Sequence, residues 1–218
     1  MLLRGVVARS FRLPPPPSGL VWAYSERASI AGNVLTGTGT NRGHGVTADP
    51  LPATAVYFEI EMGNCATNTD RNGVGVWQVL GGPPPGAWPP DSAGVGQFFG
   101  EESFGIFSNG EGSLFALYNS DWAGNIPTPI DTDYPTYRIG IASNGVGRLW
   151  ARQVVPGGSG DYFGSSSAPP SGDPTVTLTS GDDLYICASV GFGSPAGTAT
   201  LIAPANHYGT PPSGYTAI

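Results

Sequence analysis

Two segments of this chain repeat the same pattern of apolar residues around an Asn-Gly pair. Residues 104–118 read FGIFSNGEGSLFALY, and residues 139–153 read IGIASNGVGRLWARQ. In each segment a run of strand-forming residues leads into Ser-Asn-Gly, and a second such run follows. Asn-Gly supplies the positive φ angles of a tight hairpin turn, and neither run has a helical period. The pattern predicts two β-hairpins, with Asn109-Gly110 and Asn144-Gly145 in their turns.

The segment 55–62, AVYFEIEM, alternates between apolar and polar positions. Alternation with a period of two places every second side chain on the same face of a strand. One face would carry Val56, Phe58, Ile60 and Met62, and the other Tyr57, Glu59 and Glu61. We therefore predict a half-buried strand whose polar face is open to solvent, so that replacing both glutamates with glutamine leaves the fold nearly intact.

Short apolar runs separated by turn residues continue along the chain, and no helix-sized period interrupts them. The chain has 34 glycines and 22 prolines among 218 residues, which favours many tight turns. The further predicted strands are residues 21–25, 29–35, 73–80, 175–180, 184–190 and 199–205. Trp22, Trp77 and Trp150 fall in strand-like runs, and we expect them in the core. The predicted fold is all-β, an antiparallel β-sandwich formed by residues 20–218 as one domain.

Residues 1–19 are predicted to form a separate N-terminal arm. Residues 14–17 are four consecutive prolines, which lack amide donors and favour an extended polyproline form. Arg4, Arg9 and Arg12 precede them without an acidic residue, so we expect this cationic arm to contact an assembly. Arginines interrupt its apolar residues, which argues against a signal peptide, and no run is long enough to span a membrane.

Charge and cysteine content narrow the function classes. All nine basic residues are arginines, and the net charge is −7, a balance that argues against nucleic acid as a partner. Cys187 lies in the apolar run LYICASV and is expected to be buried. The sequence leaves open whether it is bonded to Cys65.

The side chains that could support catalysis or bind a metal are few. Glu59 and Glu61 are paired carboxylates, but the run that follows lacks the third acid of jelly-roll glycosidases. His44 and His207 have no cysteine or histidine at ligand spacing, and no serine lies in a nucleophile motif. We predict no catalytic residues, no metal site and no cofactor.

Two tryptophans fall in segments that we interpret as loops. Trp88 lies among prolines next to Asp91, and Trp122 lies between Asp121 and Asn125. An aromatic ring on a stiff loop offers a flat apolar face, and nearby carboxylates and amides can bind sugar hydroxyls. We therefore predict ligand contact through these five residues. The alternative is that the two rings cover the edge of the sandwich.

The order of motifs resembles that of a SPRY-type domain, a concanavalin A-like β-sandwich. The strand YFEIE at 57–61 resembles the aromatic-Glu-Val-Glu strand of that family, and GVGV at 73–76 resembles its next strand. IGIA at 139–142 with GRLW at 147–150, LYICASV at 184–190 and PSGY at 212–215 resemble later strands and the closing motif. The likeness extends over residues 20–218, with Ile and Cys at 186–187 where the family commonly has Pro.

The resemblance implies a non-enzymatic module that binds proteins or glycans through variable loops. The long loops at 81–91 and 156–174 resemble versions found in bacteriophage virion proteins. This favours a structural protein of a phage particle, made in the host cytoplasm, with other virion proteins, further copies of itself and a host surface glycan as partners. A free lectin or glycoside hydrolase of concanavalin-like fold, and an intracellular protein-interaction module, remain the alternatives.

Overall fold

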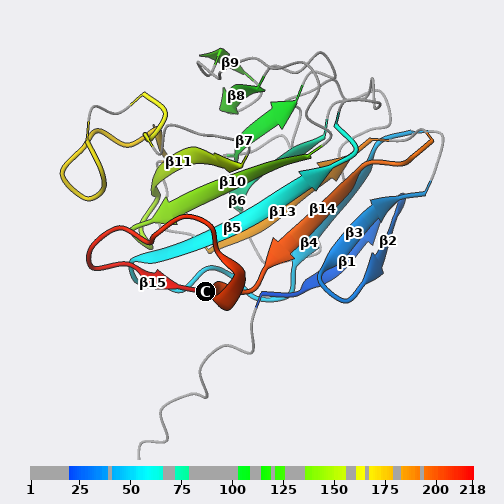
Figure 1. The fold of residues 1–218 in the computed structure, drawn as a ribbon, viewed down its shortest axis with the longest axis horizontal. Helices are drawn as coiled ribbons and strands as arrows, with labels where there is room; N and C mark the ends of the chain where they lie inside the picture. Colours follow the sequence, from blue (N-terminus) through cyan, green and yellow to red (C-terminus); the bar gives the residue numbers. More distant parts are fainter. Residues whose placement is uncertain are drawn as a thin grey trace, which may run out of the picture.

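A computed structural model shows two antiparallel β-sheets packed face to face (Figure 1). It describes residues 20–38, 41–65, 72–78, 103–108, 114–118, 121–125, 136–155, 161–164, 167–178, 183–191 and 194–218. The predicted arm, residues 1–19, lies outside these ranges. No helix among the described residues is long and apolar enough to cross a membrane.

The first sheet has seven strands in the order β1-β4-β13-β6-β7-β8-β9. They are β1 (Trp22–Glu26), β4 (Gly43–Thr47), β13 (Leu184–Val190), β6 (Gly73–Gln78), β7 (Ser103–Ser108), β8 (Leu114–Tyr118) and β9 (Asp121–Asn125). The second sheet has the order β12-β11-β10-β5-β14-β3-β2, with β15 added in parallel beside β5. These are β12 (Val176–Thr177), β11 (Arg148–Val155), β10 (Thr136–Ser143), β5 (Val56–Gly63), β14 (Thr198–Ile202), β3 (Val34–Gly37), β2 (Ala28–Ala31) and β15 (Thr216–Ala217).

The core lies between the sheets, and the alternation in β5 explains its position. Phe58, Ile60 and Met62 are fully buried in it, and Ile60 pairs with Ile139 of β10 and Leu201 of β14 across the second sheet. Burying each such side chain contributes roughly 1.5–3 kcal/mol. The predicted antiparallel sandwich and its apolar β5 face are confirmed.

Both predicted hairpins are present, as β7–β8 and β10–β11. The turn of the first lies outside the described residues. In the second, Gly145 and Gly147 have φ angles of +80° and +97°. The side-chain oxygen of Asn144 accepts hydrogen bonds from the backbone amides of Val146 and Arg148. The Asn-Gly pair is therefore in the turn, but Asn144 caps the loop through its side chain instead of adopting a positive φ.

Other predictions were wrong in detail. Residues 29–35 are two strands, because Gly32 has a φ of +61° and turns the chain between β2 and β3. Residues 121–125 are strand β9 and not part of a loop. Strand β4 was not predicted, since its sequence GHGVT has two glycines; a side chain at Gly45 would collide with Leu35.

The three strand tryptophans, Trp22, Trp77 and Trp150, are buried as predicted. Cys65 and Cys187 are both buried and are not joined by a disulfide, which answers the question that the sequence left open. Burial raises the pKa of the Cys187 thiol well above its usual value.

Candidate functional site

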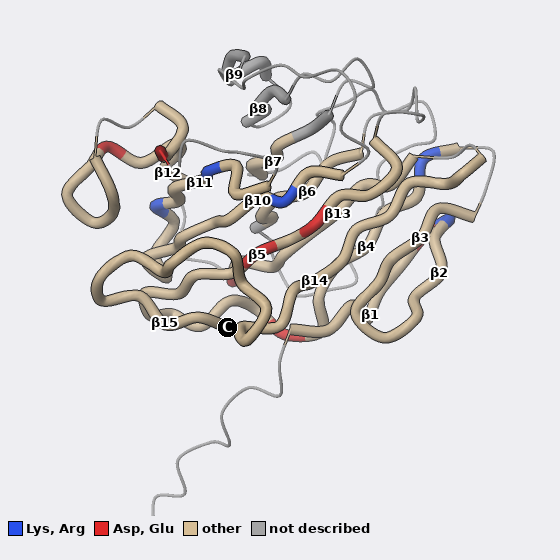
Figure 2. Tube along the Cα trace, in the orientation of Figure 1, with Lys and Arg blue, Asp and Glu red and all other residues tan. Residues whose placement is uncertain are grey.

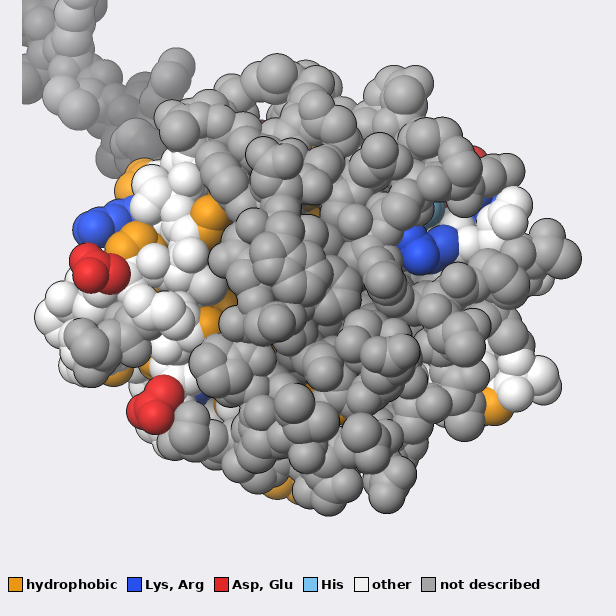
Figure 3. Space-filling view, turned by 90° about the horizontal axis from the view of Figure 1, so that it is seen from above, with side chains coloured by type: hydrophobic (Ala, Val, Ile, Leu, Met, Phe, Trp, Pro, Cys, Tyr) orange, Lys and Arg blue, Asp and Glu red, His pale blue; other side chains and the backbone are white. Residues whose placement is uncertain are grey.

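The residues predicted to bind ligand are only partly within the described structure. Trp88 and Asp91 lie outside it, as do Arg4, Arg9 and Arg12. Asp121, Trp122 and Asn125 lie on β9, the edge strand of the seven-stranded sheet, where Trp122 pairs with Leu117. Figure 3 views the molecule from the side of β8 and β9, and the described charged side chains there stand at its two ends. Ligand binding by these residues stays a prediction.

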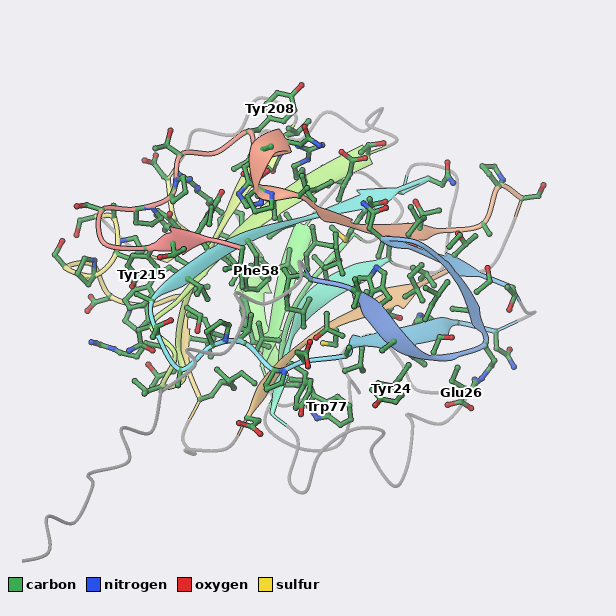
Figure 4. All side chains as sticks on the ribbon, turned by 90° about the horizontal axis from the view of Figure 1, so that it is seen from below. Tyr24, Glu26, Phe58, Trp77, Tyr208 and Tyr215 are labelled. Atoms are coloured by element: carbon green, nitrogen blue, oxygen red, sulfur yellow. The ribbon has the colours of Figure 1, made fainter. Side chains whose placement is uncertain are left out.

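Among the described residues, a cluster of charged and polar side chains lies on the outer face of the eight-stranded sheet. The chain after β14 crosses this face as a single 3₁₀ turn, Pro204–Asn206, followed by irregular backbone that ends in β15. Figure 4 shows Phe58 between the sheets, with Tyr208 projecting from one side of the molecule and Trp77 on the opposite side. The outer face of β5 is thus covered, and the prediction that it is open to solvent was wrong.

Glu59 is the centre of this covered face, and its side chain is completely buried. Its carboxylate accepts hydrogen bonds from the Tyr57 hydroxyl at 2.9 Å and from the backbone amides of Tyr208 at 3.0 Å and Gly209 at 2.7 Å. A guanidinium nitrogen of Arg138 lies 3.7 Å away. A buried carboxylate needs such partners, because desolvation of the bare charge costs several kcal/mol.

Arg138 on β10 connects Glu59 to the surface. Its Nε and Nη2 atoms donate to one oxygen of Glu61, at 3.2 and 2.7 Å, and its Nη1 donates to the Asn206 carbonyl at 3.0 Å. Figure 2 shows the acidic positions of β5 beside a basic position of the neighbouring strand β10. Arg138 therefore joins two strands of the sheet to the segment that covers them.

A second arginine, Arg152 of β11, holds the same segment further along. It donates to the Tyr57 hydroxyl at 3.2 Å and to the Thr210 carbonyl at 2.6 Å. Burial raises the pKa of the Tyr57 hydroxyl above its usual value, against the opposing effects of Arg152. A side chain at Gly140 or Gly209 would collide with that hydroxyl, so both glycines are needed for the close approach.

Above this cluster, an aromatic ring is exposed on the surface. Tyr208 is 73% exposed, and the Arg138 guanidinium lies 4.8 Å from the centre of one of its faces. Glu61, whose side chain is 31% exposed, and the exposed Asn206 lie around it. We call these four residues, Glu61, Arg138, Asn206 and Tyr208, the Tyr208 surface.

This arrangement favours binding over catalysis. Glu59 has no contact with solvent, so it cannot act on a substrate while the segment covers it. A tyrosine and an arginine held in one geometry are typical of energetically important positions in interfaces. Within the described ranges, no three histidine, cysteine, aspartate or glutamate side chains lie close enough together to hold a metal ion.

The sequence offered only partial signals for this surface. The Tyr57-Glu59-Glu61 alternation indicated the correct face of β5, but its cover comes from residues about 150 positions later in the chain. Such a contact has no local period.

Comparisons with known proteins support the fold. No protein-family model and no curated protein matches the chain. A solved structure of stonustoxin matches with a TM-score of 0.52 and 12% identity, over 84% of this chain and 28% of the stonustoxin chain. The SPRY domain of human HERC1 matches with a TM-score of 0.49 and 13% identity, over 84% of this chain and 96% of that domain.

A further human SPRY domain matches with a TM-score of 0.48 and 17% identity, over 82% of this chain and 96% of that domain. Identities this low show a likeness of fold alone, and the stonustoxin match supports the antiparallel β-sandwich. This chain spans 28% of the length of the stonustoxin chain. The matches do not test the predicted phage origin.

Proposed function

We propose that this chain is a non-enzymatic binding module that binds a partner protein or a host glycan through the Tyr208 surface. The main support for this proposal is an aromatic ring that is 73% exposed, on backbone held by two hydrogen bonds to the buried Glu59 carboxylate. A surface that is already ordered avoids much of the entropy loss of binding. The ring supplies apolar area, and Glu61, Arg138 and Asn206 supply charges and polar groups beside it.

A glycan array tests the class of partner when two quantities are measured on it: binding of the chain and release of sugar from the bound glycans. We expect a labelled full chain to bind without releasing reducing sugar, or to bind no glycan and a protein partner instead. Steady release of sugar would favour the glycosidase alternative. In either case Tyr208→Ala should weaken binding roughly 30-fold, because an interface hot spot contributes about 2 kcal/mol.

Val146→Ala is the matched control for that substitution. Val146 is 68% exposed at the tip of the β10–β11 hairpin, so Val146→Ala shortens an exposed apolar side chain at another place on the surface. Equal weakening by Tyr208→Ala and Val146→Ala would contradict a site at Tyr208. Trp88→Ala and Trp122→Ala test the ligand contacts predicted from the sequence.

We further propose that the partner assembly is a phage particle and that residues 1–19 attach the module to it through Arg4, Arg9 and Arg12. The support is the cationic arm without acids and the resemblance of the long loops to those of virion proteins. Deleting residues 1–17 should leave the sandwich folded and abolish copurification with assembled particles. Undiminished copurification would contradict attachment through the arm, and it would leave the Tyr208 surface as the contact to examine.

A further inference from the structure

An apolar groove lies where the first and last described parts of the chain meet. Its volume is about 390 Å³, near the lower end of the range of ligand pockets. Leu20, Val21, Asn33, Leu201, Ile202, Ala203, Pro204 and Ile218 line it. Val21 is 46% exposed, so apolar surface remains open to solvent there.

The Asn33 side chain, the one polar side chain in the lining, already makes a hydrogen bond within the protein. The Asn33 side chain donates to the Leu201 carbonyl at 2.7 Å, and the Asn33 carbonyl accepts from the Trp22 indole at 3.0 Å and from the Leu201 amide at 3.0 Å. The lining therefore offers mainly apolar contact. A segment that brings few amide donors can lie in it without leaving them buried and unsatisfied.

We propose that the four prolines at 14–17 of the same chain fold back into this groove. A proline has no backbone N–H, so a run of prolines brings no amide donor that the apolar lining would leave unsatisfied. Polyproline is also ordered before it binds, and four residues span about 12 Å, which suits a groove of this size. Only Ser18 and Gly19 separate the run from Leu20, which is itself part of the groove wall.

The short connection favours the chain's own prolines over those of another copy. Ser-Gly is a turn-forming pair, so it allows the direction of the chain to reverse. A segment attached by a two-residue linker has an effective concentration in the millimolar range, far above that of a second molecule at micromolar concentration. Docking would fix the root of the arm and leave residues 1–13, with their three arginines, to extend from one defined point.

A cysteine pair tests this placement in the full chain. Pro15→Cys combined with Ala203→Cys should give a disulfide within one molecule under mild oxidation at micromolar protein, detected on a non-reducing gel and by peptide mass. Pro15→Cys with Asp173→Cys is the control, because Asp173 is exposed beyond β12 and β11, at the other end of the sheet order. The native Cys65 and Cys187 are buried and should not react.

A disulfide-linked dimer from the first pair would overturn the proposal in favour of a neighbouring copy. Equal crosslinking in both pairs, or none in either, would overturn docking altogether. Stability gives a second measurement. Replacing residues 14–17 by Gly-Ser-Gly-Ser should lower the melting temperature by about 2–4 °C. Ala203 is part of the groove wall, so Ala203→Arg would obstruct the groove with a long charged side chain. The same replacement of residues 14–17 should have no effect in that background, and equal shifts in both backgrounds would contradict docking.

Discussion

Replacing Glu59 with glutamine should destabilise the fold strongly, although the side chain keeps its size. Glutamine offers one acceptor oxygen in place of two and adds an NH₂ group. Whichever way it is turned, donors among Tyr57, Tyr208, Gly209 and Arg138 face another donor. Hydrogen bonds to a charged group contribute about 1.5–3 kcal/mol each, and breaking a buried ion pair costs about 3–5 kcal/mol.

We therefore expect a loss of about 3–5 kcal/mol, a large part of the 5–15 kcal/mol that stabilises a typical domain. With an m value of about 2–3 kcal/mol per molar, the urea midpoint falls by about 1–2 M. Tryptophan fluorescence suits the measurement, because Trp22, Trp77 and Trp150 are all buried. Hydrogen exchange adds a local readout: the amides of Tyr208 and Gly209 should lose protection.

Glu61→Gln is the matched control on the same strand and the same face. Its carboxylate contacts Arg138 but is 31% exposed, so the substitution should cost less than about 1 kcal/mol. If the two variants differ by less than about 0.5 kcal/mol, Glu59 is not the organising residue of the covered face. The sequence-based expectation that both replacements are harmless would then be correct.

Three other substitutions test separate parts of the structure. Gly145→Val should lower the free energy of unfolding in urea by about 1–3 kcal/mol, because φ is +80° and the new side chain would meet the Ala53–Thr54 backbone. The control Val146→Ala should change it by less than about 0.5 kcal/mol, and equal effects of the two substitutions would contradict the turn geometry. Burial, and to a lesser extent the charges of Arg42 and Arg27, lowers the pKa of His44 from 6.5 to about 3. The contribution of the neutral His44 to stability is therefore full above pH 6.5, and it falls by up to about 1.4 kcal/mol per pH unit as the pH drops towards 3. His44→Gln should remove that part of the acid dependence, and parallel curves would refute the assignment. Gly140→Ala should cost about 1–3 kcal/mol in the wild type and less in a Tyr57→Phe background, since the hydroxyl it meets is gone; strict additivity would contradict the contact.

Local pattern was enough to predict most strands of the core. Strand β13 has the predicted bounds, 184–190, because its seven residues are apolar or small and turn residues flank them. The alternation in β5 also indicated which side chains face the other sheet. These features depend on neighbours in sequence, and a single sequence contains that information.

What the sequence concealed depends on contacts between distant segments. Strand β4 is glycine-rich because the Leu35 side chain of another strand occupies the space over Gly45, and β9 is composed of residues usual in turns. The burial of Glu59 is decided by the 203–210 segment, which has almost no regular structure of its own. A side chain's alternation fixes its direction, but its exposure depends on what the rest of the chain places over it.

The charged cluster explains why that irregular segment has one position. An apolar covering face would bury the sheet as well, and it could slide without losing much contact, since hydrophobic contact is not directional. Glu59, Arg138 and Arg152 instead bind particular backbone groups, the amides at 208 and 209 and the carbonyls at 206 and 210. Because each bond fixes one residue, the cluster sets the register of the segment and therefore the position of the Tyr208 ring. Stability of the cluster and affinity for a partner should then be linked: a substitution at Glu59, which no partner can touch, should weaken binding by loosening the surface above it.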